Sequence, residues 1–439
     1  MYFAPVKRGT FSLYLGEIMS IEGSEQISAG RKWLIIFTLS LGAGLIYQLP
    51  YLRFTYYDPL QKALGLDHTS FGNLMSVYGL VAMFMYWPGG WIADRFSSRK
   101  LLTFSLVATA CGGFWLSTFP SYYICLLIHA IWGVTSILTF WSALVKVITR
   151  ITSEEEQGKI FGFIEGGRGI SASLVAFSTI ALFSWMGEKT SDFSIVINIY
   201  SVIIFLSGIL CWFLLEDNAS EIKSGDVIKD ILVVLKMPAA WMMAGVIFCV
   251  YTGYAALSYT TPYMTEMFGL SVATAGVLGT VRTQILKAIG GPIGGMLSQK
   301  FGSATRVIRW GCIAMTFSLM AFLLMPANSS FLFLMIGNMM IFAGIIFALR
   351  GIYFSTIKEG KTPATLVGAV AGFISFVGYM PDSFIYTLIG HWLDKYPGGT
   401  GYQYMFMYMI LFSVLGIFIS TILIRYMKRN NGVYPVPSK

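Results

Sequence analysis

The chain has 439 residues, of which 56% are hydrophobic and only 12% charged, with a formal net charge of +9. Soluble domains carry about 25% charged residues, so this composition excludes a soluble globular protein. Apolar runs of about 20 residues recur along nearly the whole chain, and this pattern predicts an all-α membrane protein.

Twelve transmembrane helices are predicted from these apolar runs. In chain order they cover 33–57, 71–93, 101–119, 122–148, 159–185, 193–215, 239–264, 272–297, 305–325, 330–357, 364–393 and 402–425. The single long polar spacer, at 216–238, divides them into two six-helix halves at 33–215 and 239–425. We expect the spacer and the two tails, 1–32 and 426–439, to be cytoplasmic.

The distribution of basic residues sets this orientation. With both termini inside, the inner loops hold nearly all of the loop lysines and arginines, whereas the outer loops hold only Lys62, Lys189 and Lys395. Such a bias is the positive-inside rule of membrane proteins, so the net charge does not indicate nucleic-acid binding. The short tails and loops favour a bacterial plasma (inner) membrane protein. No nucleotide motif or metal-ligand spacing occurs, so we expect no cofactor. We also expect no removable signal peptide.

The two halves resemble each other in sequence. GGWIADRFSSRK at 89–100 and GGMLSQKFGSATR at 294–306 both follow the second span of their half. GKIFGFIEGGRG at 158–169 matches GAVAGFISFVG at 368–378 in the fifth span. Both offsets are about 205–210 residues, which indicates pseudo-symmetric halves with a substrate site between them near the midplane.

The loop GGWIADRFSSRK resembles the signature of the major facilitator superfamily, with Asp94 and Arg95 at its acidic and basic positions. The resemblance implies a twelve-helix transporter in which Asp94 and Arg95 form a cytoplasmic latch. In the second half, Gln299 stands where the acid would be, so the resemblance implies no second acidic latch. Within the superfamily, the chain is similar to the anion-transporting branch of organophosphate/phosphate antiporters and nitrate/nitrite porters, without matching either.

Five cations and two acids lie inside the predicted spans. The cations are Arg53, Arg168, Arg282, Lys287 and Arg350, and the acids are Glu165 and Asp382. An arginine at a helix centre costs about 2.5–3.5 kcal/mol on insertion scales, so each should face a cavity or a partner. The excess of three positive charges favours a cavity that attracts anions and repels cationic drugs.

Arginine can bind an anion in the middle of the membrane. Arg282 lies about 11 residues into the eighth span, close to the midplane, and is either an anion ligand or part of a buried pair. Lys287 is a further ligand, a gate residue or a snorkelling lysine. Arg53 lies among aromatic residues that include Tyr51 and Tyr57. These three residues either contact the substrate or form an interfacial belt with a snorkelling arginine.

The remaining intramembrane charges allow two readings each. Arg350 either contributes to the inner cavity as a substrate ligand or extends to the cytoplasmic surface. Glu165 and Arg168 are three residues apart on one helix face, so they form either a structural ion pair or a gate and coupling pair. Asp382 follows a proline that interrupts the eleventh span, where it either carries a coupling proton or neutralises an arginine.

These features predict a secondary transporter, not an enzyme, that moves a small anion (organic phosphate, sulfonate, carboxylate or sugar acid, or nitrate-like) by alternating access. Without an ATP-binding motif, the energy must come from a proton or a counter-anion, and uptake is favoured over efflux. We expect a monomer in the lipid bilayer. Two alternatives are an exporter of amphiphilic compounds and a non-transporting membrane sensor with a transporter fold.

Overall fold

A computed structural model describes residues 28–151, 154–217, 232–326, 328–360, 362–363 and 366–429. Within these ranges the chain is helical and contains no strand. Eight helical segments of the described residues are long and apolar enough to cross a membrane on length and composition alone. The predicted linker 216–238 lies largely outside the described residues, as do most of both predicted tails.

The first half consists of six spans, two of which are interrupted. They are α2 (Ala29–Leu45) continued by η2 (Leu52–Phe54) and α3 (Tyr57–Leu64); α4 (His68–Arg95); α5 (Ser98–Leu116); α6 (Tyr122–Gly133) continued by η3 (Val134–Trp141) and α7 (Ser142–Ile151); α8 (Glu154–Trp185); and, after η4 (Thr190–Asp192), α9 (Phe193–Leu214).

The second half repeats this arrangement. Its spans are α11 (Pro238–Ala256) continued by η5 (Leu257–Tyr259) and α12 (Thr260–Phe268); α13 (Val272–Thr280) continued by η6 (Val281–Ile285) and α14 (Leu286–Phe301); α15 (Ala304–Leu324); α16 (Leu332–Ile352), after η7 (Ser329–Phe331) and before α17 (Ser355–Glu359); α18 (Val367–Gly378) continued by η9 (Met380–Ser383) and α19 (Ile385–Lys395); and α20 (Gly399–Arg429).

Helix packing follows the predicted pseudo-symmetry. In the first half α5 packs along α9, and α2 packs between α8 and α9. In the second half α15 packs along α20, and α11 packs between α18 and α20. The third and sixth spans therefore pair in both halves, and the first span packs against the fifth and sixth in both. The twelve-helix, two-half architecture predicted from the sequence is confirmed.

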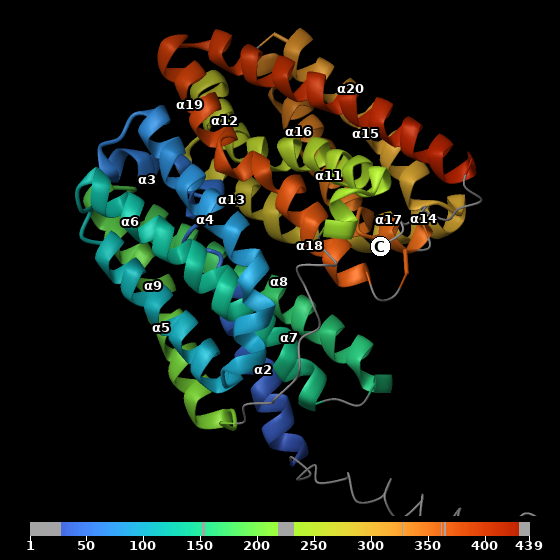
Figure 1. The fold of residues 1–439 in the computed structure, drawn as a ribbon. Coiled ribbons are helices and arrows are strands. Elements are labelled where there is room, and N and C mark those ends of the chain that lie inside the picture. The colour runs from blue at the N-terminus through green and yellow to red at the C-terminus, as the bar shows by residue number, and fades with distance from the viewer. Residues whose placement is uncertain are drawn as a thin grey trace, which may run out of the picture.

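The two halves meet at one end and diverge at the other (Figure 1). At the outer end, α4 packs along α19 and α8 packs against α13. At the inner end, α7 lies away from α14 and α17 (Figure 1). Gly166 of α8 and Gly295 of α14 illustrate the difference, since a Cβ placed on either would meet no atom within 4 Å. With the orientation predicted from the basic residues, this arrangement is closed to the outside and open toward the cytoplasm.

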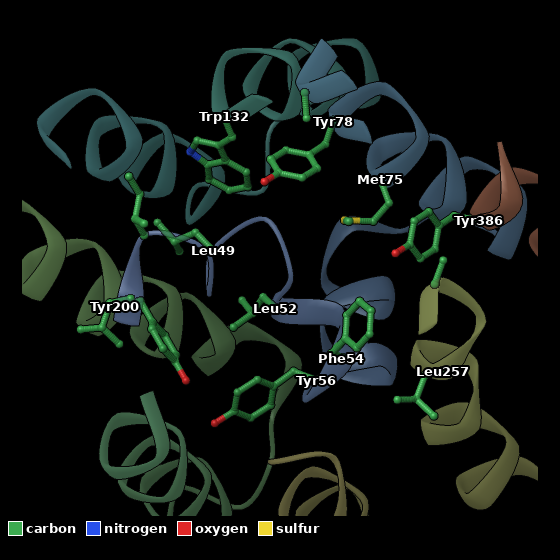
Figure 2. Close-up of a cluster of buried hydrophobic side chains, with 14 of the residues drawn as sticks. Leu49, Leu52, Phe54, Tyr56, Met75, Tyr78, Trp132, Tyr200, Leu257 and Tyr386 are labelled. Atoms are coloured by element: carbon green, nitrogen blue, oxygen red, sulfur yellow. The ribbon is translucent and has the colours of Figure 1, made fainter. Parts of the chain in front are cut away.

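The core at the outer end combines residues of both halves. Figure 2 shows Leu52 and Phe54 of η2, with Leu257 of η5 and Tyr386 of α19 beside Phe54. All four side chains are at most 3% exposed. The short helix η2 forms because the first span breaks after Leu45, and the break places Arg53 inside this core rather than on a continuous helix face.

Candidate functional site

A narrow pocket lies between the two halves near the middle of the spans. Its polar lining consists of five tyrosines and one carboxylate: Tyr51, Tyr78, Tyr86, Tyr251, Tyr379 and Asp382. These residues come from the first, second, seventh and eleventh spans, so both halves contribute. A pocket with convergent polar groups at an interface between packed units is the usual form of a small-molecule site.

Asp382 is the acid of this pocket, and it is only 5% exposed. Its carboxylate accepts hydrogen bonds from the hydroxyls of Tyr251 at 2.7 Å, Tyr386 at 3.0 Å and Tyr51 at 3.3 Å. Pro381 interrupts the eleventh span here and produces the 3₁₀ turn η9. Three hydroxyl donors stabilise the charged form of Asp382 without a cation, so a proton on the carboxylate would change the hydrogen bonding of these tyrosines.

Arg350 approaches the pocket from α16 through its aromatic wall. Its guanidinium carbon lies 3.6 Å from the ring centroid of Tyr254 and 5.1 Å from that of Tyr251. Tyr251 in turn donates to Asp382, so one ring connects the guanidinium and the carboxylate. Arg350 can therefore contribute positive charge to the pocket while its side chain is held by ring faces.

Three further charged residues lie on the inner side of this region. Arg168 forms a salt bridge with Glu165, as the i, i+3 spacing predicted, and its Nε donates to the Ala43 carbonyl at 3.2 Å. Lys287 of α14 is exposed and lies within electrostatic range of Arg168, Arg350 and Glu165. The three cations Arg168, Lys287 and Arg350 therefore come from spans five, eight and ten, and Glu165 is paired with the first of them.

Arg282 is fully buried, and η6 positions it. This segment is a π-helical turn within the eighth span, a distortion that is frequent at functional sites. The guanidinium donates to Thr260 Oγ1, to Thr261 Oγ1 at 3.1 Å and to the Phe54 carbonyl at 2.9 Å. The last bond joins the two halves. Its Nε has no partner, and the described residues provide no carboxylate at salt-bridge distance.

Arg53 lies in an aromatic cage that both halves build. Its guanidinium carbon is 4.7–5.0 Å from four ring centroids, those of Tyr57, Phe71, Tyr259 and Tyr386. Its one hydrogen bond goes to the Phe71 carbonyl at 3.2 Å, which leaves Nε and Nη2 without partners. In the part of the chain that the structure describes, no acid forms a salt bridge with it.

The structure brings some of the predicted residues together and separates others. Tyr51 and Asp382 share the central pocket. Arg282 lies at a second, closely packed pocket between spans seven, eight and ten, and Arg53 lines neither pocket. Tyr57 is fully buried with its ring against Arg53 rather than facing the pocket.

The predicted cytoplasmic latch is only partly visible. The side chain of Asp94 lies outside the described residues, and Arg95 is exposed at the end of α4. Neither position therefore tests the latch. The function of every predicted site residue remains a prediction.

Sequence reasoning missed Tyr251 and Tyr386 as partners of Asp382. Tyr386 follows Asp382 by four residues, about one helical turn, and that spacing was a usable signal. Tyr251 lies 131 residues away in another span, and only the packing of α11 against η9 brings it close.

The family model of the Major Facilitator Superfamily matches residues 33–384. The chain belongs to this superfamily. Inner membrane protein YqcE of Escherichia coli is 36% identical over 391 residues, which cover 87% of this chain and 92% of that protein. Inner membrane protein YihN of the same organism is 35% identical over 404 residues, covering 90% and 96%. The probable nitrate/nitrite antiporter NarK1 of Thermus thermophilus is 25% identical over 288 residues, covering 63% and 62%.

Solved structures support the same fold. A bacterial homologue of the human lysosomal transporter Spinster superposes with a TM-score of 0.73 at 15% identity, covering 95% of this chain and all of that one. Together with the family match, this makes the chain a multi-pass transporter of the bacterial inner membrane that acts on a small molecule. It is not an enzyme.

Proposed function

We propose that this superfamily member transports a small anionic solute by alternating access. The observation that carries the proposal is Arg282, a fully buried guanidinium without a carboxylate partner in the described residues. A buried charge is normally paired, and breaking such a pair is strongly destabilising. An anion that passes between the halves would supply the missing negative charge.

The remaining intramembrane charges also support a negatively charged substrate. Arg53 is also buried without an acid partner among the described residues, and Arg350 and Lys287 add positive charge around the pocket. Against them stand Glu165, which is paired with Arg168, and Asp382, which tyrosines hold. A low-dielectric cavity with this surplus concentrates anions and repels cations.

The positions of these four cations suggest which of them contact the anion in each arrangement. In the inward-open arrangement, Lys287 and Arg350 are closest to the cytoplasmic opening, whereas Arg53 and Arg282 belong to the closed outer side. We propose that Arg53 and Arg282 contact the anion when the outer side opens, and that Arg350 and Lys287 contact it when the inner side opens. The relative named as a nitrate/nitrite antiporter is consistent with an anion, while the chemical class of the anion remains open.

Asp382 is the proposed coupling site for a proton. Its carboxylate lies in the pocket that both halves line, where protonation would respond to the side to which the pocket opens. A counter-anion exchanged at the same cations is the other coupling mode. We further propose that the protein is a monomer that takes up its substrate.

The experiment is counterflow into proteoliposomes that contain the purified protein. Each candidate anion (organic phosphates, sulfonates, sugar acids, carboxylates and nitrate) is preloaded singly, and uptake of the same compound in labelled form is measured. Hydrophobic cations are tested in the same way as a second panel. Exchange of one anion class supports the proposal. Exchange of amphiphilic cations alone would support the exporter alternative, and exchange of no compound would favour a sensor.

A further inference from the structure

The N-terminus of α4 is capped by two aspartates, one from each half of the protein. Asp67, the residue before the helix, accepts a hydrogen bond from the backbone N–H of Ser70 at 2.6 Å. Asp394, at the end of α19, accepts from the backbone N–H of His68 at 3.0 Å and of Thr69 at 2.7 Å. The hydroxyl of Thr69 donates to the same carboxylate.

This division of the cap has a physical consequence. The first N–H groups of a helix have no partner within the helix, and a negative charge beside them is favourable. At α4, two of these N–H groups, those of His68 and Thr69, bond to a residue that moves with the second half of the protein. If the halves separated at the outer end, His68 and Thr69 would lose their acceptor and Asp394 its donors.

Backbone contacts fix Asp394 in this position. A Cβ on Gly390, one turn before Asp394, would lie 2.3 Å from the carbonyl oxygen of His68, so α19 touches α4 with no side chain between them. Two other contacts close the same end: Thr265 of α12 donates to Asp58 of α3 at 2.8 Å, and Glu266 lies 3.8 Å from the His68 ring. Asp394 is the carboxylate among them that binds backbone donors across the interface.

We infer that Asp394 is the latch of the outer gate, a positioning residue that holds the transporter in its inward-open arrangement. It caps α4 from the opposite half when the outer side is closed and releases α4 when that side opens. The inference rests on the alternating-access part of the proposed function and does not depend on the charge of the substrate.

The test compares Asp394→Asn with Asp67→Asn in the full-length protein. Both variants neutralise one aspartate at the same helix end, but only Asp394 links the two halves. An Ala82→Cys reporter in the central pocket is labelled with a membrane-impermeant maleimide from the outside of right-side-out vesicles. Inside-out vesicles establish that the reporter reacts, and the chain without the reporter corrects for its native cysteines.

Asp394→Asn is expected to raise the rate of outside labelling by about tenfold or more, equivalent to about 1.4 kcal/mol in the balance between the two arrangements. Asp67→Asn should leave outside labelling near that of the parent, although it weakens the helix end. Equal labelling of the parent and Asp394→Asn would overturn the inference, as would an equal increase in both variants, because a local capping effect would then explain it. A protein that exchanges none of the tested anions could still show this change in labelling. The substrate proposal and the gate inference are therefore tested separately.

Discussion

The hydroxyl of Tyr251 donates to the carboxylate of Asp382 at 2.7 Å, and the Tyr251 ring lies 5.1 Å from the guanidinium carbon of Arg350. A single tyrosine thus lies between the one acid of the central pocket and the cation nearest to it. Loss or gain of a proton on Asp382 changes the hydrogen bonding of Tyr251 directly. This geometry connects the proposed coupling proton to the proposed anion ligand.

Asp382→Asn should uncouple transport from the proton gradient. Asparagine keeps the shape and can still accept a hydrogen bond, but it cannot exchange a proton. We expect counterflow of the anion to persist, whereas accumulation driven by a pH gradient, about tenfold per pH unit for one proton, should disappear. Accumulation that follows the pH gradient as in the parent would contradict this role. The control is Tyr386→Phe, which removes one of three donors and keeps the acid.

Gly294→Ala and Gly295→Ala should have opposite effects on stability. A Cβ on Gly294 would lie 2.2 Å from the carbonyl oxygen of Ala348, so α14 would have to move away from α16. We expect a destabilisation of about 1–3 kcal/mol. A Cβ on Gly295 meets nothing within 4 Å, and alanine should stabilise the helix by up to about 1 kcal/mol. Thermal unfolding in detergent measures both, and a similar loss in the two variants would contradict the packing described.

Phe71→Leu tests the aromatic cage of Arg53. The ring centroid of Phe71 lies 4.7 Å from the guanidinium carbon, and leucine retains apolar bulk without the ring face. Removal of one desolvated cation–π contact should cost about 2 kcal/mol. The matched control, Phe71→Tyr, keeps the ring. The measurement is again thermal unfolding, and equal stability of the two variants would show that the ring faces do not stabilise Arg53.

Much of the fold was predictable because apolar length and charge asymmetry directly reflect the membrane. Twelve spans in two similar halves were expected from the apolar runs, the polar spacer and the repeated motifs of the chain. The breaks were harder to predict. The first span ends its regular helix at Leu45, and π-helical turns occupy Val134–Trp141 and Val281–Ile285, because packing between spans overrides local preference there.

The charged residues were identified in the sequence, but apart from the pair Glu165 and Arg168 their partners were not. Arg53 and Arg282 were identified as possible anion ligands, and the structure gives them separate surroundings on the closed outer side. The bonds from His68 and Thr69 to Asp394 span 326 and 325 residues. Such contacts depend on how the two halves approach each other, and no local pattern in the chain encodes that approach.

Arg282 provides the most direct test of anion recognition. Counterflow of the anion identified in the panel is measured for the parent, Arg282→Lys, Arg282→Gln and the control Arg306→Gln, which removes an exposed charge at the start of α15. We expect Arg282→Gln to abolish counterflow, Arg282→Lys to raise KM by about tenfold or more because the guanidinium fork is lost, and Arg306→Gln to resemble the parent. Unchanged anion counterflow in a folded Arg282→Gln variant would contradict the account.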